Sequence, residues 1–185
     1  MMKNISLLGV VAGALLCSTQ VNAITGTSSV SATFTSTIEA GTCTSQIQDS
    51  TGKSVTELGF GDVFKPELVN KTRTLPFKIA FTNCAGVKSA TVQAAAGSGG
   101  ACSGASSNGD SFAAGNATGI EVWKGAVDTG TLLSCKTPTA QKVTISGSAL
   151  NVDMTSRIVI ANGRTISDVT TGASSAPVTF TVTYQ

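Results

Sequence analysis

The stretch that decides the fold is Gly172-Ala-Ser-Ser-Ala-Pro-Val-Thr-Phe-Thr-Val-Thr-Tyr-Gln185. Beyond Pro177 its residues alternate strictly between threonine and apolar or aromatic side chains, which are Val178, Phe180, Val182 and Tyr184. A period of two indicates a β-strand with one buried face, and β-branched and aromatic residues suit that pleated surface. Pro177 precedes the strand, where its missing N–H does least harm. We expect the outer edge of this strand to be free unless another segment or another protein pairs with it.

Residues 1–23 have the features of a cleaved export signal. Lys3 supplies a positive start, and the apolar run that follows is too short to cross a bilayer. Lipid modification of Cys17 is the alternative, but Leu16 stands where that chemistry needs a small residue. We therefore expect the mature chain to begin at Ile24.

The composition favours one exported β domain. Removing 23 of the 185 residues leaves 162, which is enough for a single domain with a sizeable core. The sequence has 12 Lys and Arg against 10 Asp and Glu, so the loss of Lys3 lowers the net charge from +2 to +1. No basic footprint for nucleic acid is visible in so balanced a chain. Because no segment shows a convincing helical period, we expect an all-β protein. We also expect no nucleic-acid partner and no small-molecule cofactor.

Four cysteines remain once the leader is removed: Cys43, Cys84, Cys102 and Cys135. An even number in an exported protein indicates disulfides, and four cysteines allow three connectivities. There is no histidine and no C-x-x-C spacing, so we expect no metal site. We favour Cys43 with Cys84 and Cys102 with Cys135, each closing a loop of roughly 30 to 40 residues and contributing about 3 to 4 kcal/mol. The spacing alone does not select this pairing.

Residues 24–38 alternate in the same way, with a weaker apolar face. The members of this face are Ile24, Gly26, Ser28, Val30, Ala32, Phe34, Ser36 and Ile38. The first turn signal after them is Ala40-Gly41. Because the segment is longer than an ordinary strand of about five or six residues, we expect part of it to lie outside its own domain.

The middle of the chain has the pattern of short strands separated by turns. Thr51-Gly52-Lys53-Ser54 ends like a phosphate-binding loop, but Ile47 stands where that motif needs glycine, so we interpret it as a hairpin turn. Residues 97–119 form a loop of small residues, Trp123 is expected to fill the core, and Asn162-Gly163 is a strong turn signal. A sandwich is favoured, with strands at 44–48, 55–60, 75–81, 90–95, 120–124, 143–150 and 152–160.

Together these features resemble the pilin subunits that Gram-negative bacteria assemble by the chaperone-usher pathway, the family of type 1 and P fimbriae. The shared features include the leader, the alternating extension, a cysteine five residues after Ile38, and a second cysteine at Cys84. The C-terminal pattern is the most specific, with Gly172 fourteen residues from the end, alternating hydrophobic residues, and a penultimate Tyr184. The match covers essentially the whole mature chain.

The resemblance implies an all-β, incomplete immunoglobulin-like sandwich that lacks its final strand and carries an N-terminal donor-strand extension. Residues 1–23 would be the signal peptide, 24–36 the extension and 37–185 the pilin domain. A periplasmic chaperone would first fill the groove left by the missing strand. At the outer-membrane usher, the extension of a neighbouring subunit would replace the chaperone. The chain would then be a shaft or adaptor subunit of a fimbria that supports cell adhesion.

The resemblance also implies roles for individual residues. The central donor side chains would be Val30, Ala32 and Phe34, preceded by Ile24, Gly26 and Ser28. The edge that meets the chaperone would include Gly172, Val178, Phe180, Val182 and Tyr184, with Gln185 presenting the carboxylate that the chaperone grips. Cys43 and Cys84 match the disulfide of the family, whereas Cys102 and Cys135 are additional. Many relatives have a glycine where Ser36 stands, so individual donor pockets are not aligned.

The sequence leaves alternatives open. The two terminal strands could pair within one closed sandwich, giving a self-sufficient monomer. An adhesin that binds host carbohydrate is a second alternative, although such subunits usually carry a separate receptor-binding domain and lack a donor extension. An enzyme is the third. Without histidine a Ser-His or Cys-His nucleophile is impossible, and surface turns explain the acids Asp49, Glu57 and Asp62 equally well.

Overall fold

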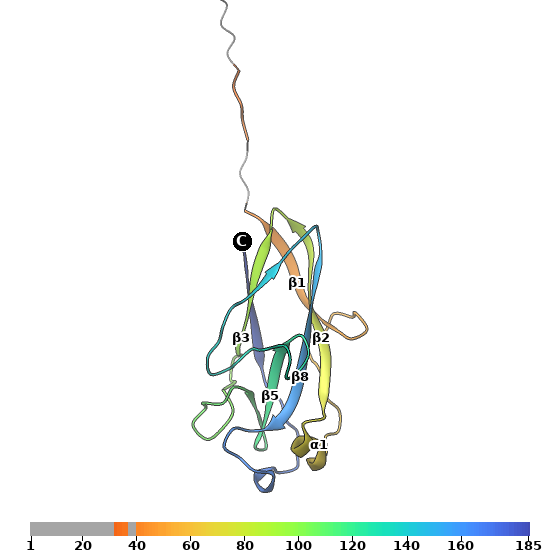
Figure 1. Cartoon of the computed structure of the whole chain (residues 1–185), viewed down its shortest axis with the longest axis vertical. Helices are drawn as coiled ribbons and strands as arrows, with labels where there is room; N and C mark the ends of the chain where they lie inside the picture. Colours follow the sequence, from red (N-terminus) through yellow and green to blue (C-terminus); the bar gives the residue numbers. More distant parts are fainter. Residues whose placement is uncertain (1–31, 37–39) are drawn as a thin grey trace, which may run out of the picture. The chain divides into compact units, whose positions relative to one another are not determined.

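Figure 1 shows the computed structural model, which describes residues 32–36 and 40–185. The expected leader and the donor positions Ile24, Gly26, Ser28 and Val30 lie outside the described residues. The described elements, in chain order, are β1 (Thr42–Asp49), α1 (Lys65–Asn70), β2 (Thr74–Ala85), β3 (Ser89–Ala96), β4 (Phe112–Gly115), β5 (Thr118–Lys124), β6 (Thr131–Leu132), β7 (Gln141–Thr144), β8 (Leu150–Ile160), the 3-10 turn η1 (Ile166–Asp168) and β9 (Val178–Tyr184).

The strands form two antiparallel sheets. The larger sheet has the order β1-β2-β8-β5-β4, with β6 also paired to β5, and the smaller sheet has the order β7-β3-β9. Residues of both sheets belong to one hydrophobic core, so the domain is a sandwich. In this arrangement β1 is an edge of the larger sheet and β9 is an edge of the smaller one. The incomplete immunoglobulin-like sandwich expected from the sequence is the observed fold.

The core is built from alternate residues of the facing strands. On β2, Phe77, Ile79 and Phe81 are at most 3% exposed, and the strand register places Met154 and Val152 of β8 opposite the first two. Complete burial of side chains of this size contributes about 1.5 to 3 kcal/mol each. The smaller sheet adds a buried face of small residues from β3, namely Ala90, Val92 and Ala94.

A short helix that the sequence analysis did not predict closes one pole of the domain. Leu68 of α1 is buried against Ile158 and Val169 in a second, smaller cluster. The helix begins after Phe64, whose backbone N–H donates to the Glu67 carboxylate at 2.8 Å. Six residues are too few to display a helical period, which explains why this element left no readable pattern.

Four sequence expectations differ from the structure. Residues 97–119 were expected to form a loop, but they contain β4 and the first two residues of β5. The turn at 49–52 forms, but residues 55–60 are not a strand, and after Ser54 the chain makes only one backbone hydrogen bond back to β1. The strand expected at 143–150 is interrupted between β7 and β8, where Gly147 has a φ of 87°. Trp123 is not in the core, because Val122 is the neighbour that points inward.

Candidate functional site

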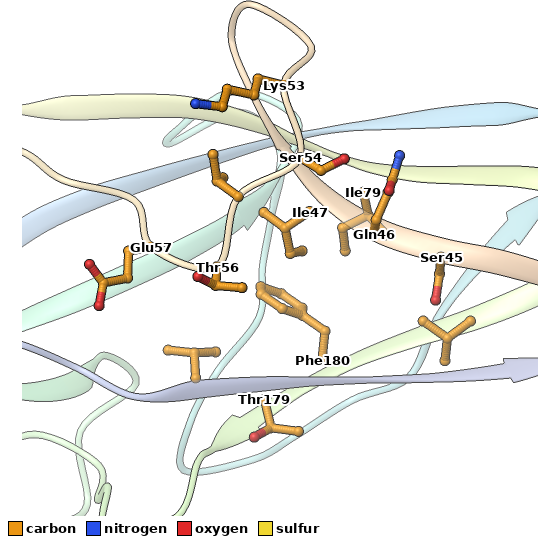
Figure 2. A pocket seen from close by; sticks show the side chains of 13 residues that line it. Ser45, Gln46, Ile47, Lys53, Ser54, Thr56, Glu57, Ile79, Thr179 and Phe180 are labelled. Atoms are coloured by element: carbon orange, nitrogen blue, oxygen red, sulfur yellow. The ribbon is translucent and has the colours of Figure 1, made fainter.

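An apolar groove separates the two edge strands β1 and β9. It encloses about 850 Å³ between Ser45–Ile47 of β1 and the alternating face of β9, with Ile79 of β2 at its floor. Figure 2 shows Ile47 and Phe180 pointing toward one another in this groove, while Thr179 points away. A second hollow of about 900 Å³ continues it toward residues 174–177, past Phe77 and Ile120. The two hollows share lining residues, so they form one long slot.

No described strand pairs with the edge of β9 that faces the groove. Gln185 exchanges two backbone hydrogen bonds with Ser89, at 2.8 and 3.1 Å, and Pro177 accepts one from Gly97. Because hydrogen-bonding direction alternates along an antiparallel strand, the threonines of β9 also bond to β3. The residues that alternate with these threonines direct their backbone N–H and C=O groups to the free edge, and their side chains point into the groove. These residues are Val178, Phe180, Val182 and Tyr184, all half-buried.

The opposite wall of the groove begins with β1 and continues as extended chain. The hairpin after β1 is fixed by the bond from Val55 N–H to Ile47 O at 3.0 Å and by the Asp49 carboxylate. That carboxylate accepts hydrogen bonds from the Thr51 hydroxyl and from the backbone N–H groups of Thr51 and Lys53. The Thr51 hydroxyl is the main cause that lowers the pKa of Asp49. Residues 56–59 then pass along the groove with no backbone partner in the described part of the chain.

Tyr184 closes one end of the groove. Its hydroxyl donates to the Cys43 carbonyl oxygen at 3.0 Å, which joins β9 to β1. The ring is held edge-on against Phe81, with centroids 6.4 Å apart, and Cys43 is itself fixed by its disulfide to Cys84. The lining of the first hollow accordingly extends only as far as Ser45 and Val182. We call this contact the Tyr184–Cys43 bridge.

The remaining predicted site residues lie as follows. Ala32 and Phe34 are exposed, and the Phe34 side chain is 94% accessible to solvent. Gly172 lies outside the groove, beside the Asn116 side chain. Gln185 accepts backbone hydrogen bonds from Lys88 and Ser89. Sequence reasoning missed the groove residues that do not belong to its two terminal patterns, chiefly Ile47, Val55 and Ile79.

The second disulfide, Cys102–Cys135, is also present. Both favoured pairings therefore occur in the structure. Within the described residues there is no helix long and apolar enough to cross a bilayer, and His, Cys, Asp and Glu residues form no group of three or more suited to a metal ion.

A cluster of charged residues lies away from the groove, on the outer face of the larger sheet. The Arg157 side chain, only 5% exposed, pairs with Glu121 at 2.7 Å and with both oxygens of Asp128 at 2.6 and 2.8 Å. Its guanidinium also lies over Trp123, 5.8 Å from the ring centroid. The hydrogen bond to Asp128 is the main cause that raises the pKa of Arg157, and it lowers the pKa of Asp128. The Glu121 and Asp128 carboxylates both pair with Arg157, so the cluster is a structural ion-pair network rather than an acid–base pair.

Comparison with known proteins assigns the family. An uncharacterized fimbrial-like protein of Escherichia coli strain K12, YadL, is 36% identical over 171 residues, covering 85% of each chain. This chain belongs to the family of fimbrial-like proteins. No protein-family model matches the chain.

Solved structures show the same fold. The rod subunit PapA of the P pilus has a TM-score of 0.50 at 17% identity, and the match covers 77% of this chain and 99% of PapA. A chain of a solved chaperone-usher pilus has a TM-score of 0.55 at 19% identity, covering 85% and 96% respectively. The fimbrial-like chain therefore shares the sandwich fold of these pilus subunits.

Proposed function

We propose that the groove accepts an extended strand from a neighbouring subunit and that residues 24–36 of this chain are donated in turn to the next. The observation that carries the proposal is the coincidence of an apolar groove with an edge of β9 that no described strand pairs with. Between Val178 and Tyr184, every second residue offers one N–H and one C=O to a strand laid beside it. Strand addition uses such main-chain groups for affinity and alternate side chains for specificity.

The donor segment complements the groove chemically. The last apolar side chain of the extension is Phe34, which is 94% exposed in the structure and would become buried on insertion. Complete burial of a side chain of this size contributes about 1.5 to 3 kcal/mol. The side chains of residues 24–36 carry no charge, so their insertion into an apolar groove requires no desolvation of a charged side chain.

Residues 56–59 favour the same interpretation from the other wall. The sequence predicts a strand here, yet the described residues offer this extended segment no ladder partner. A strand lying between β9 and this segment would have hydrogen-bonding neighbours on both sides. On this proposal, the strand predicted at 55–60 lacks its ladder partner until a neighbouring subunit supplies one.

We infer that a periplasmic chaperone covers the groove before assembly and that the outer-membrane usher is where one strand replaces the other. An exposed apolar groove beside an unpaired strand edge promotes unwanted association, so the free subunit needs a temporary cover. Gln185 and the free edge of β9 are the part of the subunit that such a chaperone would hold. The assembled fimbria would lie at the cell surface.

A structural rather than catalytic role fits the acidic residues. The Asp49 carboxylate is occupied by its own turn, and Glu121 and Asp128 are occupied by Arg157. The described residues show no feature of their own that favours the adhesin alternative.

The proposal is tested by separating the donor role from the acceptor role. Deleting residues 24–34 should abolish polymerisation while leaving chaperone binding intact. Phe180→Asp should abolish both, because it places a charge in the groove. Thr181→Asp is the matched control, since Thr181 is exposed on the same strand, lines neither hollow and should affect neither property. A stable monomer whose behaviour ignores the deletion would refute the proposal; co-expression with the chaperone followed by size-exclusion chromatography provides the measurement.

A further inference from the structure

We propose that the Tyr184–Cys43 bridge keeps the chain's own extension out of its own groove and so reserves the groove for the strand of a second copy. This inference rests on the proposed function. Strand addition alone does not determine whether the extension fills the groove of a neighbour or the groove of its own chain, because the same side chains suit both.

Chain connectivity fixes how a self-filling strand would have to enter. The extension joins the domain immediately before β1, two residues from Cys43. To reach its own groove it would have to reverse direction before Gly41 and run back along the free edge of β1. The extension would then enter the groove at the end where the Tyr184 ring lies. A strand from another copy has no such constraint and can enter from the end near Val178.

The bridge occupies the group that a self-filling strand would need first. Ile47 directs its carbonyl oxygen toward the groove, since it accepts a bond from Val55. Cys43 is an even number of residues away, and its carbonyl oxygen likewise faces the groove, where it accepts the Tyr184 hydroxyl. Strand pairing along β1 from this end therefore requires the tyrosine to give up its hydrogen bond and leave its contact with Phe81.

The root of the extension is also held in place. A Cβ atom on Gly41 would lie only 2.7 Å from the backbone carbon and oxygen of Gly86, which shows how closely the two segments are packed. Thr42 then pairs with Ala85, and Cys43 is bonded to Cys84. The chain at residues 41–43 therefore cannot move aside to open a second path into the groove.

The test compares two variants that each lose one hydroxyl from the same strand. Tyr184→Phe keeps the ring on Phe81 and removes the bridge, whereas the control Thr183→Val alters a residue on the exposed face. The mature chain is refolded at low concentration, and stable monomer and polymer are separated by size exclusion with light scattering. One hydrogen bond typically changes an equilibrium by a factor of about 2 to 10, so Tyr184→Phe should raise the monomer-to-polymer ratio by about that factor. An unchanged ratio in Tyr184→Phe relative to Thr183→Val would overturn the inference.

A second measurement does not depend on the folding of the variant. A photoreactive amino acid at position 34 is introduced into the mature chain, and nitrogen-15-labelled and unlabelled chains are refolded together. Cross-links between position 34 and β9 should join labelled to unlabelled chains as often as random pairing predicts. Cross-links confined to single chains in the otherwise unaltered protein would refute both strand exchange and this inference. Polymerisation of that protein with no effect of Tyr184→Phe would refute the inference alone.

Discussion

The two seams of the sandwich are closed in different ways. On one side, the connection from β6 to β7 crosses from the larger sheet to the smaller, and its Leu133 and Cys135 are only 2% and 5% exposed. The Lys124 ammonium on β5 also donates to the Lys142 carbonyl on β7 at 3.0 Å. On the other side, the β1/β9 seam has the Tyr184–Cys43 bridge at one end and an apolar groove along the rest. The domain closes one seam with its own residues and has an apolar groove along the other.

The largest expected effects on stability come from truncating one apolar side chain in each seam. Leu133→Ala should lower the free energy of unfolding by about 2 to 5 kcal/mol, because it leaves a cavity in the closed seam. Phe180→Ala should cost less in the unfilled subunit, where the ring is half-buried, and more once a peptide of residues 24–36 is bound. Urea unfolding with and without that peptide measures both. Equal costs in the two states for Phe180→Ala would mean that the groove is not where the strand binds.

Removing the disulfide of the closed seam should have the next largest effect. Cys102 and Cys135 are 33 residues apart, so replacing both with serine should cost about 3 to 4 kcal/mol in the chain-entropy estimate. The Cys43–Cys84 bridge spans 41 residues and should contribute a similar amount. Only its loss should also weaken peptide binding, because Cys43 anchors the Tyr184–Cys43 bridge. Thermal unfolding and peptide titration of both double variants separate the two effects, and equal losses of peptide affinity would contradict the comparison.

Prolines at adjacent positions of β9 test whether its outer edge is free. The Thr181 N–H faces Gln93 of β3, so Thr181→Pro removes a ladder bond and should destabilise the domain by about 1 to 3 kcal/mol. The Val182 N–H faces the groove, so Val182→Pro should affect the unfilled domain less and weaken peptide binding. Circular dichroism and peptide titration report the two properties. Equal destabilisation of the unfilled domain by the two prolines would show that both edges of β9 are paired.

Some features of the fold and of the groove were predictable from the sequence, and others were not. Strand β9 was predicted because its alternation is local and strict. The strand predicted at 55–60 did not form, and residues 56–59 have no backbone hydrogen-bond partner among the described residues. Trp123 was wrongly placed in the core because strand periodicity defines two faces but not which one meets the other sheet. The groove combines β1, β2, β9 and the segment after β1, and their proximity depends on tertiary pairing that no local pattern contains.

Asp49 gives the smallest and most local test of the open seam. Its pKa lies below the ordinary value of 3.8, chiefly because the Thr51 hydroxyl donates to the ionised carboxylate. A carboxyl group with a lowered folded-state pKa stabilises the fold above its unfolded pKa, and this contribution is lost as the pH falls through the lower folded value. The stability difference between the wild-type protein and Asp49→Asn should therefore be largest above about pH 4 and shrink in more acidic solution.

Asp168→Asn is the matched control for this acid effect. The pKa of Asp168 is also lowered, chiefly by the backbone N–H of Thr165, but Asp168 belongs to η1 and does not line the groove. Urea unfolding between pH 3 and pH 7 should show a similar pH dependence for both variants. Only Asp49→Asn should also weaken binding of the peptide of residues 24–36, because the Asp49 turn sets the hairpin that holds Val55 against Ile47. If Asp168→Asn weakened peptide binding equally, the effect would reflect general stability, and the hairpin would have no separate part in shaping the groove wall.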